Sequence, residues 1–435
     1  MIAPPIPSAA DSALEEHAYK KVFLRIVPFL MICYVVAYLD RINVGFAKLQ
    51  MEVDLGFSQT VYGLGAGMFF IGYFFFEVPS NLIMYRVGAK LWIARIMITW
   101  GLLSACFVFI KTPFWFYTVR FLLGAAEAGF YPGVILYLTY WFPSRRRAQI
   151  VAVFMSAIPI AGILGNPLSG WIMDAFDQTA GMRGWQWMFL IEAGPALIMG
   201  ILVLFLLDNG IRSAKWLTEN EKQLLERNIE ADAGFKKKSP HSLAGVFTDP
   251  RVWMMSAIYF CFVMGQYGLT FWMPTLVKAT GVKGNFNTGL LSAIPFLFAV
   301  VVMILAGRSA DKRGERRWHL IIPAFCGAVG FVVAALYADN TVVAIAFLSL
   351  AAGGVLTCAP LFWSLPTAFL RGSAAAAGIA AINSIGNLAG FVSPYLIGFL
   401  KDFTLNNRSG MYMLAGMLVL GAFLVLRTRP EEVNH

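Results

Sequence analysis

Long apolar stretches follow one another along almost the whole chain, and they constrain its fold more than any other feature. An α-helix needs roughly 20 apolar residues to cross a bilayer core of about 30 Å, and 435 residues hold about twelve such stretches. Because 59% of the residues are hydrophobic and only 13% are charged, most of the surface must face lipid. We therefore predict an all-α integral membrane protein with twelve transmembrane helices. Their expected ranges are 22–47, 60–82, 90–110, 114–141, 149–173, 186–207, 252–276, 287–307, 318–338, 341–369, 373–400 and 409–427.

The formal net charge of +10 could indicate a nucleic-acid partner, or it could reflect membrane topology. The positions of the basic residues distinguish these two explanations. With the N-terminus inside, 25 Lys and Arg residues lie on inner ends and loops, 7 lie on outer ones, and Arg41 and Arg120 lie within spans. This bias follows the positive-inside rule. It predicts a multi-pass protein of the inner, or plasma, membrane with both termini cytoplasmic, and no nucleic-acid partner.

A polar segment at 208–250 separates the spans into two sets of six and is the expected cytoplasmic linker. The predicted organisation is a tail at 1–21, a first half at 22–207, this linker, a second half at 251–428 and a tail at 429–435. Thr218 and Glu221 have the spacing of a capping box, which predicts that a short surface helix begins there. We expect Lys236, Lys237 and Lys238 to face anionic headgroups.

Short motifs recur in the two halves at an offset close to 227 residues, which is typical of transporter folds built from duplicated halves. The matching elements are Arg86-Val87-Gly88 with Lys312-Arg313-Gly314, Pro132 with Pro360, and the Pro167, Gly170 and Asp174 run with Pro394, Gly398 and Asp402. Since these matches stay in register, we predict two pseudo-symmetric halves.

The segment between spans eight and nine resembles a signature loop of the major facilitator superfamily, G-x-x-x-D-[RK]-x-G-x-[RK]-[RK]. The resemblance implies that its acid and bases form cytoplasmic contacts that hold an outward-open state. The equivalent loop between spans two and three has Tyr85 in place of the acid, which leaves a salt-bridge latch on that side in question. The matching residues are Gly307, Asp311, Lys312, Gly314, Arg316 and Arg317.

An ordered set of further motifs, spread over residues 20–427, resembles the anion:cation symporter family. The resemblance implies the major facilitator fold, with halves that rock around a central site, and transport of a carboxylate such as a sugar acid, tartrate or an aromatic acid, usually with protons. The set comprises Tyr38 to Asn43, Arg120 with Gly124 and Glu127 through Pro132, Trp141-Phe142-Pro143, and Trp363 with Asn383 and Asn387.

Charged residues inside the spans are candidates for the transport chemistry, because a charge at the centre of a bilayer costs about 2.5–3.5 kcal/mol. Arg120 and Glu127 are seven residues apart, so they share one helix face. We expect Arg41 or Arg120 to bind the anionic group of the substrate, and Asp40 and Glu127 to take and release protons. Alternatively, Asp40 with Arg120, or Glu127 with Arg120, forms a structural pair, and Arg41 snorkels to the interface.

Polar and aromatic residues on the other expected cavity helices complete the candidate substrate site. For Glu77 and Glu192 we favour structural hydrogen bonding over transport, and a helix-contact role for Asn387 is an equal alternative. The substrate-site candidates besides the two arginines are Tyr38, Tyr73, Gln266, Tyr267, Trp363, Asn383 and Asn387.

No sequence motif indicates a cofactor, a metal site or an enzyme, since the five cysteines lie within spans and no nucleophile and base pair is recognisable. We predict a proton-coupled symporter that imports a small organic anion, functions in the lipid bilayer and is a monomer. The alternatives are a receptor or sensor that binds the same anion without moving it, and a uniporter or exchanger.

Overall fold

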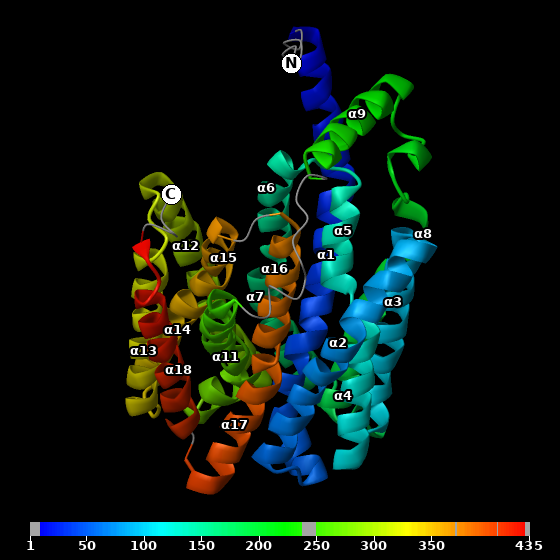
Figure 1. The fold of residues 1–435 in the computed structure, drawn as a ribbon. Helices are drawn as coiled ribbons and strands as arrows, with labels where there is room; N and C mark the ends of the chain where they lie inside the picture. The colour runs from blue at the N-terminus through cyan, green and yellow to red at the C-terminus, as the bar shows by residue number, and fades with distance from the viewer. Residues whose placement is uncertain (1–8, 237–248, 370–371, 407, 431–435) are drawn as a thin grey trace.

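The computed structural model describes residues 9–236, 249–369, 372–406 and 408–430, and this part of the chain is built from helices. Eleven of its helical segments are long and apolar enough to cross a membrane. The remaining expected span, 373–400, corresponds to α16 (Gly372–Asn387) and α17 (Ala389–Thr404), which follow one another in line (Figure 1). The architecture is therefore the predicted helical membrane bundle.

The first half contains α1 to α8. The helices are α1 (Ala9–Leu55), α2 (Gln59–Val87), α3 (Ala89–Ala105), η1 (Cys106–Phe109), α4 (Pro113–Glu127), α5 (Phe130–Thr139), α6 (Ser144–Met155), α7 (Ala157–Ala175), η2 (Thr179–Gly181) and α8 (Gly184–Leu206). The expected fourth span is interrupted directly after Glu127, where Gly129 adopts a positive φ of 87°. A Cβ atom at Gly129 would lie 2.4 Å from the Ser80 hydroxyl, so this turn requires glycine.

The second half contains α11 (Pro250–Ala279), α12 (Asn285–Arg313), α13 (Trp318–Leu336), α14 (Thr341–Phe362), α15 (Ser364–Phe369), α16, α17 and α18 (Arg408–Leu426). Between the halves lie η3 (Ile211–Ser213) and the linker helix α9 (Glu219–Lys236). Both α1 and α12 extend several residues past the spans predicted for them. The spans were predicted from the length of the apolar stretches, so they end at the first polar residues. The helices themselves continue to Leu55 and Arg313.

The predicted duplication is visible in two matching contacts between the halves. The Asp174 carboxylate at the end of α7 accepts hydrogen bonds from the backbone N–H groups of Asn285 and Phe286 at 2.8 and 2.7 Å. The Asp402 carboxylate at the end of α17 accepts the same kind of bond from Gln59 and Thr60 at 3.2 and 2.7 Å. Each half therefore caps the first turn of a helix in the other half.

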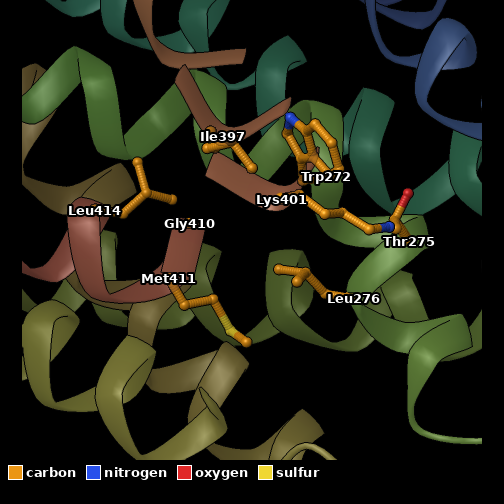
Figure 2. A pocket seen from close by; sticks show the side chains of 9 residues that line it. Trp272, Thr275, Leu276, Ile397, Lys401, Gly410, Met411 and Leu414 are labelled. Atoms are coloured by element: carbon orange, nitrogen blue, oxygen red, sulfur yellow. The ribbon is translucent and has the colours of Figure 1, made fainter. Parts of the chain in front are cut away.

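These reciprocal caps lie at the end of the bundle that is remote from α9 (Figure 1). Further contacts between the halves at this end include a hydrogen bond of 3.1 Å from the Tyr62 hydroxyl to the Phe271 carbonyl. Lys48 is 1% exposed, and its ammonium lies 3.9 Å from the centre of the Trp272 ring. A small pocket beside Trp272 is lined by residues of the second half that include Lys401 (Figure 2). The halves are thus closed against each other at this end.

The linker helix packs against the first turns of α1 at the opposite end. The predicted capping box is present: the Thr218 N–H donates to Glu221 at 2.8 Å and the Glu221 N–H donates to the Thr218 hydroxyl at 3.3 Å. Lys21 donates to the same carboxylate at 3.1 Å. Burial acts to raise the pKa of Glu221, but the bonds from Thr218 and Lys21 outweigh it and hold the pKa below its usual value. Lys237 and Lys238 lie outside the described residues.

Candidate functional site

Two helices of the first half bring the predicted charged residues together in the interior of the bundle. α1 supplies Asp40 and Arg41, α4 supplies Arg120 and Glu127, and all four side chains are buried. α4 lies directly on α2, because a Cβ atom at Gly124 would be 1.9 Å from the Phe69 carbonyl oxygen. Glycine at this position allows the close approach of α4 to α2.

Arg41 and Glu127 form the ion pair at the centre of the site. The Arg41 Nε donates to Glu127 Oε1 at 2.8 Å, and Nη2 lies 2.6 Å from the same oxygen. The guanidinium also lies 5.2 to 5.4 Å from the ring centres of Tyr38, Phe69 and Tyr73. Cation–π contacts of this kind contribute up to about 2 kcal/mol when desolvated. The pair is thus enclosed by aromatic rings and holds no net charge.

Arg120 is fully buried and has no carboxylate partner among the described residues. Its Nη2 donates to the Ala66 carbonyl at 3.0 Å and its Nε to the Gly65 carbonyl at 3.3 Å. Nη1 has no hydrogen-bond partner in the described part of the chain. The guanidinium lies 5.0 Å from the centre of the Phe69 ring, the ring that Arg41 also contacts. The site therefore contains one fixed cation that a bound anion could neutralise.

Asp40 forms no ion pair with either arginine among the described residues. Its carboxylate accepts hydrogen bonds from Trp100 Nε1 at 2.7 Å, from the Ser104 hydroxyl at 3.1 Å and from Asn43 Nδ2 at 3.3 Å. Neither of the structural pairs considered from the sequence, Asp40 with Arg120 or Glu127 with Arg120, is present. The ion pair that forms joins Arg41 to Glu127. The Arg41 side chain extends from α1 toward α4 and not to the membrane interface.

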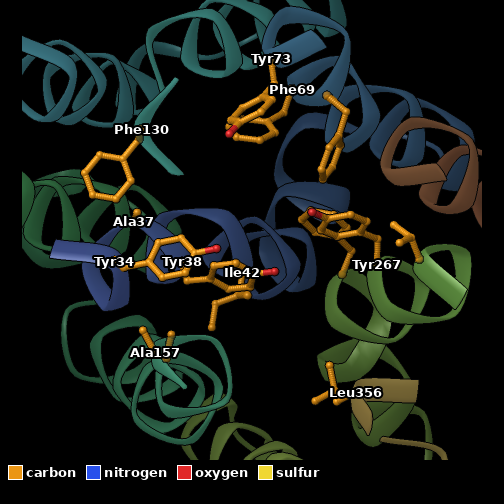
Figure 3. Packing of buried hydrophobic residues seen from close by; sticks show 14 of the residues in the cluster. Tyr34, Ala37, Tyr38, Ile42, Phe69, Tyr73, Phe130, Ala157, Tyr267 and Leu356 are labelled. Atoms are coloured by element: carbon orange, nitrogen blue, oxygen red, sulfur yellow. The ribbon is translucent and has the colours of Figure 1, made fainter. Parts of the chain in front are cut away.

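Tyr38, Gln266 and Tyr267 connect this site to the second half. The Gln266 amide donates to the Tyr38 hydroxyl at 3.2 Å, which joins α11 to α1. The Tyr267 ring packs on Phe70 of α2 with a centroid distance of 4.4 Å. Figure 3 shows the rings of Tyr38, Tyr73 and Tyr267, from three different helices, turned toward one another. Tyr38 and Tyr73 therefore contact Arg41 directly, and Gln266 is joined to this group through Tyr38.

Trp363, Asn383 and Asn387 make no ring contact or hydrogen bond with Arg41 or Arg120 among the described residues. The Trp363 ring packs on Tyr259 at a centroid distance of 4.9 Å. Asn383 and Asn387 are half-buried on α16 and make no hydrogen bond to either arginine among the described residues. All three residues lie in the second half, opposite the half that supplies the arginines.

The signature loop adopts the local contacts of a helix end. The Arg316 guanidinium donates to Asp311 at 2.6 Å, and Gly314 ends α12 with a φ of 62°. Arg317 donates to the carbonyls of Val425 and Leu426, which ties the loop to the end of α18. Gly307 and Lys312 lie on α12 itself, and only 314–317 form a connection between helices. In the equivalent turn, Lys90 N–H bonds to Asn209 at 3.1 Å and Tyr85 is exposed.

Two buried residues of α1, Lys48 and Asn43, were not among the site residues predicted from the sequence. Lys48 lies two turns after Arg41, and a longer span one would have placed it inside the membrane. Asn43 follows Asp40 by three residues, which places both on one helix face. That spacing was readable in the sequence, but amides in membrane helices are common packing residues.

Comparison with known proteins agrees with this arrangement. The sequence profile described as the Major Facilitator Superfamily matches residues 30–394. The chain belongs to the major facilitator superfamily. This transporter is 49% identical to a Pseudomonas putida protein named as the metabolite transport protein NicT, over 96% of this chain and 95% of the other. It is also 49% identical to an Agrobacterium vitis protein named as a tartrate transporter, over 97% and 98% of the two chains.

The fold is similar to solved transporters of low sequence identity. The xylose transporter XylE of E. coli in an inward open conformation superposes with a TM-score of 0.76 at 16% identity, over 94% of this chain and 96% of that one. Membership of the superfamily, together with the two relatives above, makes the protein a multi-pass membrane transporter of small molecules and not an enzyme.

Proposed function

We propose that the transporter imports a small organic anion together with protons by alternating access. The substrate class is a carboxylate such as a sugar acid, a tartrate-like acid or an aromatic acid. In this proposal the protein is a monomer of the inner membrane and both termini are cytoplasmic.

The observation that carries the proposal is the buried Arg120 guanidinium without a carboxylate partner among the described residues. A buried charge is expensive unless it is paired, and the free Nη1 is a donor with no acceptor. A substrate carboxylate would supply both the missing charge and the missing acceptor. Tyr38 and Gln266 would donate to hydroxyl or further oxygen atoms of the substrate from two sides.

The Arg41–Glu127 pair offers a simple way to couple this anion to protons. Glu127 competes with the substrate for the donors of Arg41 as long as Glu127 is charged. When Glu127 takes a proton, Arg41 is released and the site gains a second cation for the anion. Proton binding and anion binding therefore favour each other, and this reciprocal coupling is what symport requires.

The contacts between the halves suggest which state is observed. The halves are closed at the end remote from α9, where Asp174 and Asp402 cap the opposite half. With the linker in the cytoplasm, that end faces outside, so the conformation is the inward-facing one. The substrates in the names of the two relatives, a metabolite and tartrate, are consistent with a small carboxylate.

Binding measurements on purified protein test the anion site first. In a thermal-shift screen of a carboxylate panel, at least one acid should raise the melting temperature by mass action. Arg120→Ala should abolish that shift, whereas Arg212→Ala, which removes an exposed arginine of the linker, should not. Normal affinity in the Arg120 variant would show that the anion does not bind here.

A receptor and an exchanger are the alternative functions. A receptor would bind the acid without accumulating it in proteoliposomes. An exchanger or uniporter would move the acid across, but a proton gradient would not drive accumulation. Labelled uptake separates these outcomes from symport.

A further inference from the structure

Two buried carboxyl groups, those of Asp40 and Glu192, lie next to the proposed site, on the side of α1 facing α8. Glu192 of α8 is 2% exposed, and its Oε1 accepts a hydrogen bond from the Ser169 hydroxyl at 2.7 Å. Asp40 is equally buried. No Lys, Arg or His of the described residues lies within ion-pair distance of either carboxyl. Two acids are thus held in the interior without a cation.

Asn43 connects the two acids. Its Nδ2 donates to Asp40 at 3.3 Å, and its side chain also faces the Glu192 carboxyl. Within the part of the chain that the structure describes, Asn43 Oδ1 and Glu192 Oε2 are both buried oxygens without a hydrogen-bond partner. Two acceptors cannot bond to each other. One proton on the Glu192 carboxyl would provide the donor that both oxygens lack.

The surroundings favour this protonated form. α1 presents Asp40 and Asn43 to Glu192, α7 presents Ser169, and Asp40 is the one titratable group facing it that the described contacts reveal. An isolated ionised carboxylate in an apolar interior is costly, so such a group takes up a proton instead. In the observed conformation Glu192 therefore holds a proton.

The position of Ser169 connects this acid to the movement of the halves. Asn166 and Gly170 lie on either side of Ser169 in α7 and contact α12 of the other half. The Asn166 amide donates to the Ser292 carbonyl at 3.5 Å, and a Cβ atom at Gly170 would be 2.3 Å from the Asn285 carbonyl oxygen. When the halves move against each other, α7 loses these contacts with α12, so the surroundings of the helix that carries Ser169 change during the cycle.

We propose that Glu192 is a proton-carrying residue of the transport cycle, linked to Asp40 through Asn43 and separate from the Arg41–Glu127 pair. In each cycle its carboxylate accepts one proton from the outer side and returns it to water on the inner side. This inference rests on the proposed proton coupling, and it adds a site to that coupling.

The test is the number of protons carried per anion. In proteoliposomes at zero membrane potential, the logarithm of the substrate accumulation ratio rises linearly with the pH difference, and the slope is this number. Glu192→Gln should lower the slope by about one, because one titrating site is lost, whereas Glu226→Gln on α9 should leave it unchanged. An unchanged slope in Glu192→Gln overturns the inference while leaving symport intact. A slope of zero in the unmodified protein refutes the proposed symport and this inference together.

A second variant keeps the test decisive if Glu192→Gln does not fold. Ser169→Ala retains the titrating acid but removes the hydrogen bond that favours its charged form. The pH of half-maximal uptake should then rise by about one unit. The matched control is Ser256→Ala, which removes a buried hydroxyl that donates only to Val252 within its own helix. Equal pH profiles in the Ser169 variant and the unmodified protein would show that Glu192 does not titrate during transport.

Discussion

Replacing Glu127 by Gln tests the competition between this carboxylate and the substrate for Arg41. The substitution keeps the shape of the side chain and one acceptor oxygen, but it removes the charge and the titration. In the unmodified protein the anion can bind Arg41 only if it displaces the charged Glu127 carboxylate or if that carboxylate is protonated. In the variant Arg41 is held at every pH only by the weaker bond to a neutral amide, so the anion should bind more tightly wherever Glu127 would be charged.

The magnitude follows from the two contacts of 2.8 and 2.6 Å between Arg41 and Glu127 Oε1. A buried hydrogen bond to a charged group contributes about 1.5–3 kcal/mol, and a neutral one about 1 kcal/mol. The amide retains the weaker bond, so the gain in anion binding is about 1.5 kcal/mol. At 25 °C this lowers the dissociation constant about tenfold.

Titration calorimetry with the acid found in the thermal-shift screen measures this effect across a series of pH values. Affinity in the unmodified protein should fall as the pH rises, since deprotonated Glu127 recaptures Arg41. The Glu127→Gln variant should lose this fall, and the two proteins should converge at low pH. Glu226→Gln, which breaks an exposed pair with Arg212, is the control and should behave as the unmodified protein. A variant whose affinity still falls with pH as before would refute the competition between Glu127 and the anion.

Three further predictions concern the contacts that shape the bundle. Gly63→Ala places a Cβ atom 2.2 Å from the Pro394 carbonyl oxygen, whereas Gly416→Ala meets no atom within 4 Å. Only Gly63→Ala should increase the reactivity of cysteines introduced at the closed end toward impermeant reagents. Asp402→Asn weakens the cap on α2 and should reduce the free energy of unfolding by about 1 kcal/mol, which lowers the melting temperature. Because the pKa of Glu221 is lowered in the folded protein, its contribution is present above the usual carboxyl pKa and lost as the pH falls through the lowered value. The protection of the α9 amides, measured as exchange relative to the intrinsic rate at the same pH, should therefore fall in acid, and Glu221→Gln should remove this pH dependence.

The sequence predicted the elements that depend on local pattern and on repetition. Hydrophobic length set the spans, and the offset between Asp174 and Asp402 predicted the paired halves whose caps the structure shows. The spacing of Thr218 and Glu221 predicted the start of α9. Each of these features is determined by neighbours along the chain or by a repeated pattern, so one sequence is enough to read it.

The partners of the buried charges could not be read in the same way. Arg120 and Glu127 share a helix face, but the sequence does not determine how α1 is rotated against α4. That rotation pairs Glu127 with Arg41 and leaves Arg120 with backbone carbonyls. The break at Gly129 was missed because glycine is common within membrane helices, and only the contact with Ser80 requires it here.

Uptake of a labelled carboxylate into proteoliposomes is the most direct test of proton-coupled anion import. Purified protein is reconstituted, an inward proton gradient is imposed, and the internal acid is followed with and without a protonophore. We expect accumulation above the external concentration that collapses when the protonophore is added. Uptake that only equilibrates the acid, or accumulation that the protonophore leaves unchanged, would contradict the account.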